Sequence, residues 1–103
     1  MKLDTDALEI KHDSMQSKFY FPTKEAEDAV VDYTLHTKGE PNVMEITHTF
    51  VPPALRDKGI AGKITHAALN FADTNNYKVM PTCDFAKDYC DKHPEFNHLI
   101  KSN

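Results

Sequence analysis

Hydrophobic and polar residues alternate in the first part of the chain, which is the pattern of half-buried β-strands. Residues 8–11 and 18–21 both show this alternation, and the polar residues 12–16 between them are typical of a turn. We therefore predict a strand, a short turn and a second strand in this region.

A second pair of strands is predicted from composition as well as from pattern. Residues 29–36 are rich in β-branched and aromatic side chains, which favour strands. Residues 37–42 contain glycine, proline and asparagine, a strong turn signal. Because a strand pattern resumes at residues 43–51, we expect these two strands to form an antiparallel hairpin.

The pattern changes to a helical period in the second half of the chain. Between residues 60 and 75, hydrophobic residues recur at the spacing of one helix face. They are Ile60, Ile64, Ala67, Ala68, Phe71 and Ala72. Asn75 and Asn76 end this helix, and residues 77–80 are predicted to form a fifth strand.

A second helix is predicted to open within residues 81–84, with Thr82 or Asp84 as its N-cap. It stops before His93, because a residue that precedes proline resists the helical conformation. The resulting order, β-β-β-β-α-β-α, predicts an α+β fold with a mostly antiparallel sheet of about five strands and two main helices. A helical crossover joins the last strand to the sheet.

Composition sets limits on this fold. The chain has 103 residues, enough for a single domain spanning residues 1–103. No hydrophobic run is long enough to cross a bilayer, and the start lacks the hydrophobic stretch of a signal peptide. We therefore expect a cytoplasmic protein in which Cys83 and Cys90 are reduced thiols. The net charge of -4 argues against a nucleic-acid partner, and no membrane partner is expected.

The most informative stretch follows the fourth strand, which breaks at residues 51–53 and leads into the helix through residues 56–63. Two of the three glycines in the chain, Gly59 and Gly62, lie there. Glycine permits a positive φ and close approach to the backbone, while a helix start directs N–H groups and a positive dipole end outward. This basic, glycine-containing turn is therefore predicted to bind an anion, with a diphosphate as the natural ligand.

Two alternatives explain this stretch less well. An ordinary helix start gives no reason for Gly62 in the first turn, where glycine costs about 1 kcal/mol relative to alanine. A Walker A phosphate loop needs glycine at position 57 and serine or threonine at position 64, where this chain has Asp57 and Ile64.

Residues 56–61, Arg-Asp-Lys-Gly-Ile-Ala, fit the acetyl-CoA signature Gln/Arg-x-x-Gly-x-Gly/Ala, and with this element order the chain resembles the GNAT superfamily of acetyl-CoA-dependent N-acetyltransferases. Residues 48–52 and 81–85, with His-Pro at 93–94, resemble a compact branch of that superfamily, and the likeness covers residues 7–100. It implies acetyl-CoA as cosubstrate and a primary amine of a small molecule or protein as acceptor. Most members place helices between their first two strands. Here only a short turn fits, so the acceptor half is reduced.

The resemblance also implies a binding site for acetyl-CoA. Backbone N–H groups of about residues 58–63 would hold the CoA diphosphate, with Arg56 and Lys58 adding charged contacts. Backbone N–H groups near residues 49–51 would contact the acetyl carbonyl. The residues predicted to bind acetyl-CoA are Thr49, Phe50, Val51, Arg56, Asp57, Lys58, Gly59, Ile60, Ala61, Gly62, Lys63 and Cys83.

Cys83 is the first candidate for a catalytic role. It lies at the predicted start of the second helix, where the dipole favours a thiolate, and the resemblance implies that it faces the thioester. It would either accept the acetyl group covalently or line the pocket for the CoA thiol. The competing interpretation is a small buried hydrophobic residue. Cys90, Phe85 and Tyr89 are expected to pack the last helix, with Tyr89 also a candidate proton donor to the thiolate.

His48 is the candidate general base, since an imidazole titrates near neutral pH. On a regular strand it shares a face with Met44, Ile46 and Phe50, so a hydrogen-bonded core histidine is the competing interpretation. Glu45, on the opposite face, is an alternative base.

Three functions compete at this stage. The first is an N-acetyltransferase that acts on a primary amine. The second is a non-catalytic module that binds CoA or senses acyl-CoA, which the reduced acceptor half favours. The third, an interaction domain without a cofactor, leaves Gly59 and Gly62 unexplained. No metal site is expected, because the cysteines and histidines near the C-terminus lack the paired spacing of zinc ligands.

Overall fold

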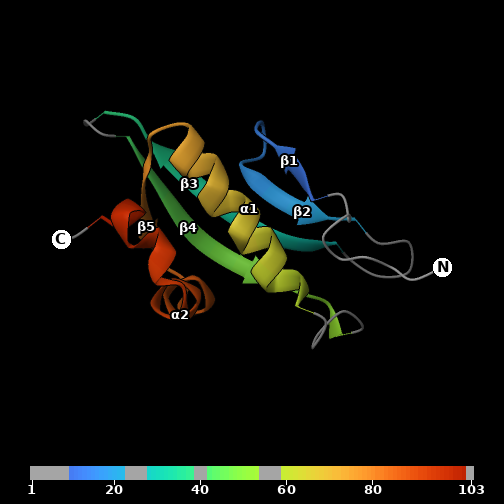
Figure 1. Ribbon diagram of the computed structural model, residues 1–103. Helices are drawn as coiled ribbons and strands as arrows, with labels where there is room; N and C mark the ends of the chain where they lie inside the picture. Colours follow the sequence, from blue (N-terminus) through green and yellow to red (C-terminus); the bar gives the residue numbers. More distant parts are fainter. Residues whose placement is uncertain (1–9, 23–27, 39–41, 54–58, 102–103) are drawn as a thin grey trace.

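The computed structural model describes residues 10–22, 28–38, 42–53 and 59–101. Its five strands form one sheet in the order β1-β2-β3-β4-β5 (Figure 1). The elements are β1 (Lys11–Asp13), β2 (Lys18–Phe21), β3 (Ala29–His36), β4 (Val43–Phe50), α1 (Ile60–Thr74), β5 (Lys78–Pro81), α2 (Asp84–Lys92) and the 3-10 helix η2 (Pro94–Leu99). The order confirms the predicted α+β fold, and η2 is an addition that the sequence pattern did not indicate.

The sheet is antiparallel except between β4 and β5, which run parallel because α1 carries the chain back between them. The predicted β3–β4 hairpin is confirmed. Figure 1 shows α1 lying across one face of the sheet, which we call the inner face, and the opposite face is the outer face. Within the described ranges, no helix is long and hydrophobic enough to span a membrane.

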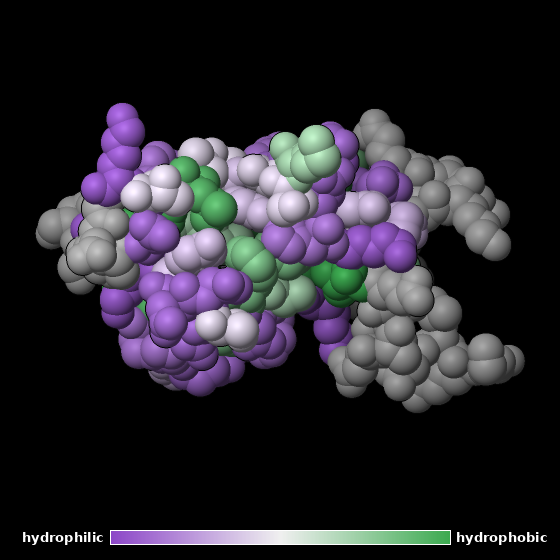
Figure 2. Space-filling model, turned by 90° about the horizontal axis from the view of Figure 1, so that it is seen from above, coloured by the Kyte–Doolittle hydropathy of each residue, from purple (hydrophilic) through white to green (hydrophobic). Residues whose placement is uncertain are grey.

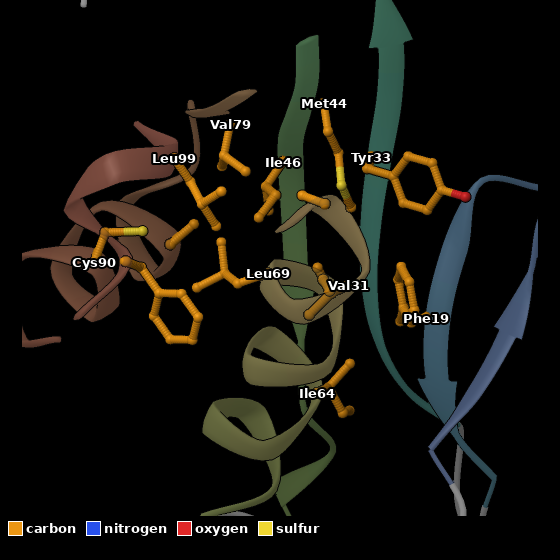
Figure 3. Packing of buried hydrophobic residues seen from close by; sticks show 14 of the residues in the cluster. Phe19, Val31, Tyr33, Met44, Ile46, Ile64, Leu69, Val79, Cys90 and Leu99 are labelled. Carbon is orange, nitrogen blue, oxygen red and sulfur yellow. The ribbon is translucent and has the colours of Figure 1, made fainter. Parts of the chain in front are cut away.

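The core lies between the inner face of the sheet and the helices, where the residues labelled in Figure 3 converge. Ile64 and Leu69 of α1 are fully buried against the sheet; the helical period predicted this for Ile64 but did not include Leu69. The other labelled residues are Phe19, Val31, Tyr33, Met44, Ile46 and Val79 from the sheet, with Cys90 and Leu99 from α2 and η2. Seen from above, hydrophobic residues follow the middle of the molecule between hydrophilic borders (Figure 2).

The first turn lies later than predicted. β1 includes His12 and Asp13, which the sequence had suggested as turn residues, while residues 8 and 9 of the predicted strand lie outside the described residues. The Asp13 carboxylate accepts hydrogen bonds from the backbone N–H groups of Met15 and Gln16, each 3.1 Å long. This side-chain bonding closes the turn over residues 14–17, and Ser17 has a φ of 56°.

The start of α2 also differs from the prediction. Its N-cap is Cys83, whose Sγ accepts the backbone N–H of Ala86 at 3.4 Å, so both Thr82 and Asp84 were wrong as N-caps. The Thr82 hydroxyl donates instead to the Glu45 carboxylate at 2.7 Å, and Asp84 is the first helical residue. The preference of threonine for N-caps is overridden here by a tertiary hydrogen bond to β4.

A β-bulge interrupts β4. Tyr33 of β3 lies opposite Ile46, but the preceding residue Asp32 lies opposite His48, so Thr47 is an extra residue on β4. A single inserted residue reverses which side chains of a strand point to which face of the sheet. The regular alternation assumed for β4 therefore ends at Ile46.

The bulge determines where the end of β4 directs its side chains. Thr49 lies opposite Val31, which is fully buried, so Thr49 is on the inner face. His48, opposite Asp32, is on the outer face. The prediction that His48 shares a face with Ile46 is wrong because the inserted residue shifts the register.

An aromatic cluster covers the β1–β2 end of the inner face. The His12 ring stacks on Phe19, with ring centroids 4.1 Å apart, and meets Phe71 of α1 edge-on at 4.6 Å. His12 also forms a hydrogen bond with the Tyr33 hydroxyl. Desolvation by these rings lowers the pKa of His12 below its ordinary 6.5, although the nearby Asp13 charge acts in the opposite direction.

This lowered pKa predicts a pH-dependent stability. His12 is harder to protonate in the native protein than in the unfolded chain. Its contribution to the free energy of unfolding is therefore complete above pH 6.5, and it is lost as the pH falls through the native pKa. We expect the difference in free energy of unfolding between the wild type and His12→Gln, measured with urea, to shrink between pH 8 and pH 5. Met15→Gln, at an exposed position in the turn that follows β1, is the control. Its difference in free energy of unfolding from the wild type should not change with pH. A pH-independent difference for His12→Gln would contradict the assignment.

Candidate functional site

The ladder between β4 and β5 stops short of the end of β4. The two strands pair from Val43 opposite Lys78 to Ile46 opposite Pro81. The carbonyl oxygen of Ile46 then accepts the backbone N–H groups of the next two residues, Thr82 at 3.0 Å and Cys83 at 3.2 Å. Because β4 continues to Phe50 while the other chain segment turns into α2, the two segments form a fork.

A thiol and a hydroxyl face each other across this fork. The Thr49 Oγ1 and Cys83 Sγ atoms are 3.3 Å apart, and both side chains are partly buried. Cys83 also caps α2, so its sulfur lies at the positive end of that helix dipole. The bulge in β4 makes the contact possible, since it turns the Thr49 side chain to the inner face.

The second cysteine is in a different environment. Cys90 is 5% exposed and is part of the hydrophobic core. Burial raises the pKa of its thiol, and the negative charges of Asp91 and Cys83 act in the same direction. Cys90 therefore packs the helix, as predicted, whereas Cys83 is accessible in part.

The two candidate bases lie on the outer face. His48 is exposed, so the interpretation as a core histidine is wrong. Glu45 accepts hydrogen bonds from the Thr82 hydroxyl at 2.7 Å and from His36 at 2.8 Å. These bonds lower the pKa of Glu45, with the Thr82 bond as the largest cause, so Glu45 is the weaker base of the two.

The start of α1 presents backbone rather than side chains. Gly59 is its N-cap with a φ of 74°, a left-handed conformation that other residues adopt only with strain. The first helical hydrogen bond runs from the Lys63 N–H to the Gly59 carbonyl at 3.1 Å, so the N–H groups of residues 60–62 point out of the helix end. Ile60 is 3% exposed and directs its side chain into the core. The predicted contacts of residues 56–58 lie outside the described residues.

A pocket of about 350 Å³ lies between α1 and α2. It is lined by Gly59, Gly62, Lys63, His66 and Tyr89. The first four follow the spacing of one helix face, and the fifth comes from α2. A Cβ atom at position 62 would lie 3.4 Å from the edge of the tyrosine ring, an ordinary van der Waals contact, so the Tyr89 ring lies close to the surface of α1 at Gly62.

Neighbouring side chains hold Tyr89 in place. Its ring stacks on His93 with centroids 4.0 Å apart, and His93 Nδ1 lies 3.2 Å from a Glu95 carboxylate oxygen. The Tyr89 hydroxyl is 3.4 Å from Nδ1 of His66. Burial raises the pKa of Tyr89, and the charges of Glu95 and Cys90 add to that effect, so the phenol remains a proton donor at neutral pH.

The contact of His66 with Tyr89 was not foreseen from the sequence. The sequence predicts phosphate binding for Gly62 and Lys63 but not for His66, which lies one turn further on the same face of α1. Its spacing of seven residues from Gly59 was the available signal. Among the described residues, no group of three or more histidines, cysteines and acidic residues is arranged to hold a metal ion.

The chain is similar to known proteins over most of its length. Residues 18–99 match the sequence model of the GCN5-related N-acetyl-transferase family. Protein NATD1 of Gallus gallus is 28% identical over 87 residues, which cover 84% of this chain and 77% of that protein. Protein NATD1 of Homo sapiens is also 28% identical over 87 residues, covering 84% and 75%. The NMR structure of a GCN5-like protein from Staphylococcus aureus matches with a TM-score of 0.70 and 28% identity, covering 93% of this chain and 90% of that one.

The different environments of the two cysteines predict a difference in reactivity. With a thiol-specific reagent under native conditions, we expect one thiol to react rapidly and the second only after unfolding. Cys83→Ser should remove the rapid phase, and the matched variant Cys90→Ser should retain it. Rapid modification of both thiols in the folded wild type would show that Cys90 is not protected as described.

Proposed function

The chain belongs to the GCN5-related N-acetyltransferase family, and on this premise we propose that it binds acetyl-CoA and transfers the acetyl group to a primary amine. The observation that carries the proposal is the fork between β4 and the start of α2, where a thiol and a hydroxyl lie 3.3 Å apart. A thioester seated there would have polar groups beside its sulfur and a strand edge beside its carbonyl.

The described residues fit the shape and charge of acetyl-CoA. The pantetheine arm is narrow and carries amide groups, which suit the edge of β4 beyond Ile46, where the pairing with β5 has ended. The diphosphate suits the start of α1, where the N–H groups of residues 60–62 point outward and the dipole is positive. Gly59 leaves this end without a side-chain cap, so an anion can approach the backbone.

The chemistry requires a neutral amine, a stabilised tetrahedral intermediate and a proton for the departing thiolate. The amine nitrogen attacks the carbonyl carbon, and the carbon–sulfur bond then breaks. The amine loses one proton in the reaction, and the departing CoA thiolate takes up one proton. We assign proton acceptance to His48 from the outer face and polarisation of the carbonyl to backbone N–H groups at the end of β4. Thr49 and Cys83 then lie beside the leaving sulfur.

The second candidate function is a non-catalytic module that binds or senses acyl-CoA. One observation favours it. Between β1 and β2 the chain has only the turn of residues 14–17, so no helix is present there to help build an acceptor site. A cofactor site of the kind proposed here would serve such a module equally well.

Two measurements together test the proposal. In an amide-resolved NMR titration with acetyl-CoA, we expect shifts concentrated at residues 49–51 and 59–63, with a second set near Cys83. CoA release should then rise above background with at least one of a panel of primary amines. Binding without release for any amine would favour the sensing module. Saturation without shifts at residues 59–63 would contradict the cofactor site.

Direct attack by the amine predicts a specific result for Cys83→Ala. Removing a group that only lines the thioester pocket should lower kcat/KM by less than about tenfold, whereas removing a covalent nucleophile costs about 10⁴-fold or more. Intact-mass measurement of the wild type mixed with acetyl-CoA should find no acetylated protein before the amine is added. An acetyl adduct that forms within one turnover and is absent from Cys83→Ala would replace direct attack by the acetyl-cysteine route.

A further inference from the structure

We propose that the pocket between α1 and α2 receives the 3′-phosphate of CoA, and that His66 donates a hydrogen bond to it. This inference rests on the proposed function, since it takes CoA as the ligand. It assigns a role to a side chain outside the residues that hold the diphosphate and the thioester.

The pocket follows one face of α1. Gly59 and His66 lie on the same face of the helix, seven residues apart, which corresponds to about 10 Å at the rise of an α-helix. The positive end at Gly59 suits one anionic group, and the pocket extends from there to His66. CoA carries two separate anionic centres, the diphosphate and the 3′-phosphate on its ribose. The pocket therefore places a second donor, His66, on the helix face that begins at the site proposed for the diphosphate.

The contacts of the His66 ring determine which of its nitrogen atoms can donate a hydrogen bond. Nδ1 of its ring lies 3.4 Å from the Tyr89 hydroxyl, a long hydrogen-bond contact. We assign the Tyr89 hydroxyl as the donor to Nδ1, which places the proton of the neutral imidazole on Nε2. Phe96 of η2 meets the ring edge-on with centroids 5.3 Å apart, which helps to fix its plane. Nε2–H is thus the hydrogen-bond donor that His66 offers to a phosphate.

Contacts within the protein hold the wall of the pocket in place. Tyr89 is fixed between the surface of Gly62 and the stacked ring of His93, which Glu95 holds from its other side. Among the described residues, Lys63 lines the same pocket one turn before His66, and Glu95 on η2 interacts with His66 through its charge.

A thermodynamic cycle tests the assignment. Dissociation constants of CoA and 3′-dephospho-CoA would be measured by calorimetry for the folded wild type and His66→Ala at one pH and one salt concentration. We expect His66→Ala to weaken CoA binding about fivefold, the range for a solvent-exposed charged contact, and to leave dephospho-CoA binding within about 1.5-fold. His66→Gln places an amide N–H near the position of Nε2 and should recover part of the affinity for CoA only.

His98→Ala is the matched control, because His98 is also an exposed histidine but pairs with Asp73 outside the pocket. It should change the binding of neither ligand. Equal losses for both ligands in His66→Ala, or no loss for either, would overturn the role of His66 while leaving CoA binding in place. If the wild type binds neither CoA nor acetyl-CoA, the proposed function fails together with this inference.

Discussion

The site depends on two events in β4 that occur within two residues of each other. At Ile46 the carbonyl oxygen accepts the two N–H groups that follow β5, which ends the parallel ladder. One residue later Thr47 is inserted as a bulge, which reverses the orientation of every side chain that follows. The first event opens the fork, and the second turns Thr49 inward to Cys83 while His48 turns outward. On a regular strand these two side chains would exchange faces, and the contact with the thiol would be lost.

Neither helix start at the site has a side-chain oxygen atom as its cap. Serine, threonine, aspartate and asparagine supply such an oxygen to the free N–H groups, whereas glycine is a common N-cap that supplies none. α1 begins with Gly59, which has no side chain, and α2 begins with Cys83, whose sulfur is a weak acceptor. Each choice gives up some helix stability and leaves the positive end of a dipole open to a ligand. Such breaks with local preference are expected where a residue serves binding rather than folding.

Local signals in the sequence predict most of the helices and strands, but they do not reveal features that depend on contacts between distant segments. The strands, α1 and the turn at Gly59 follow from local periodicity and glycine placement, and these predictions agree with the structure except at some element ends. The bulge could not be read from the sequence, because Met44, Ile46 and His48 alternate regularly and only pairing with β3 reveals the inserted residue. The cap of α2 depended on a hydrogen bond between segments 37 residues apart. The pocket required the packing of α1 against α2, which no local pattern encodes.

The two competing functions differ in what they require of the two faces of the sheet. The described helices all contribute to the core on the inner face, and the proposed cofactor site lies there, formed by the fork, the start of α1 and the pocket. That side serves a transferase and a sensing module equally. In the part of the chain that the structure describes, no helix covers the outer face, and the Glu45 carboxylate there connects β4 to the start of α2. What would make the protein a transferase is a group on the outer face that takes a proton from an amine, and the bulge that turns Thr49 toward Cys83 is also what places His48 there.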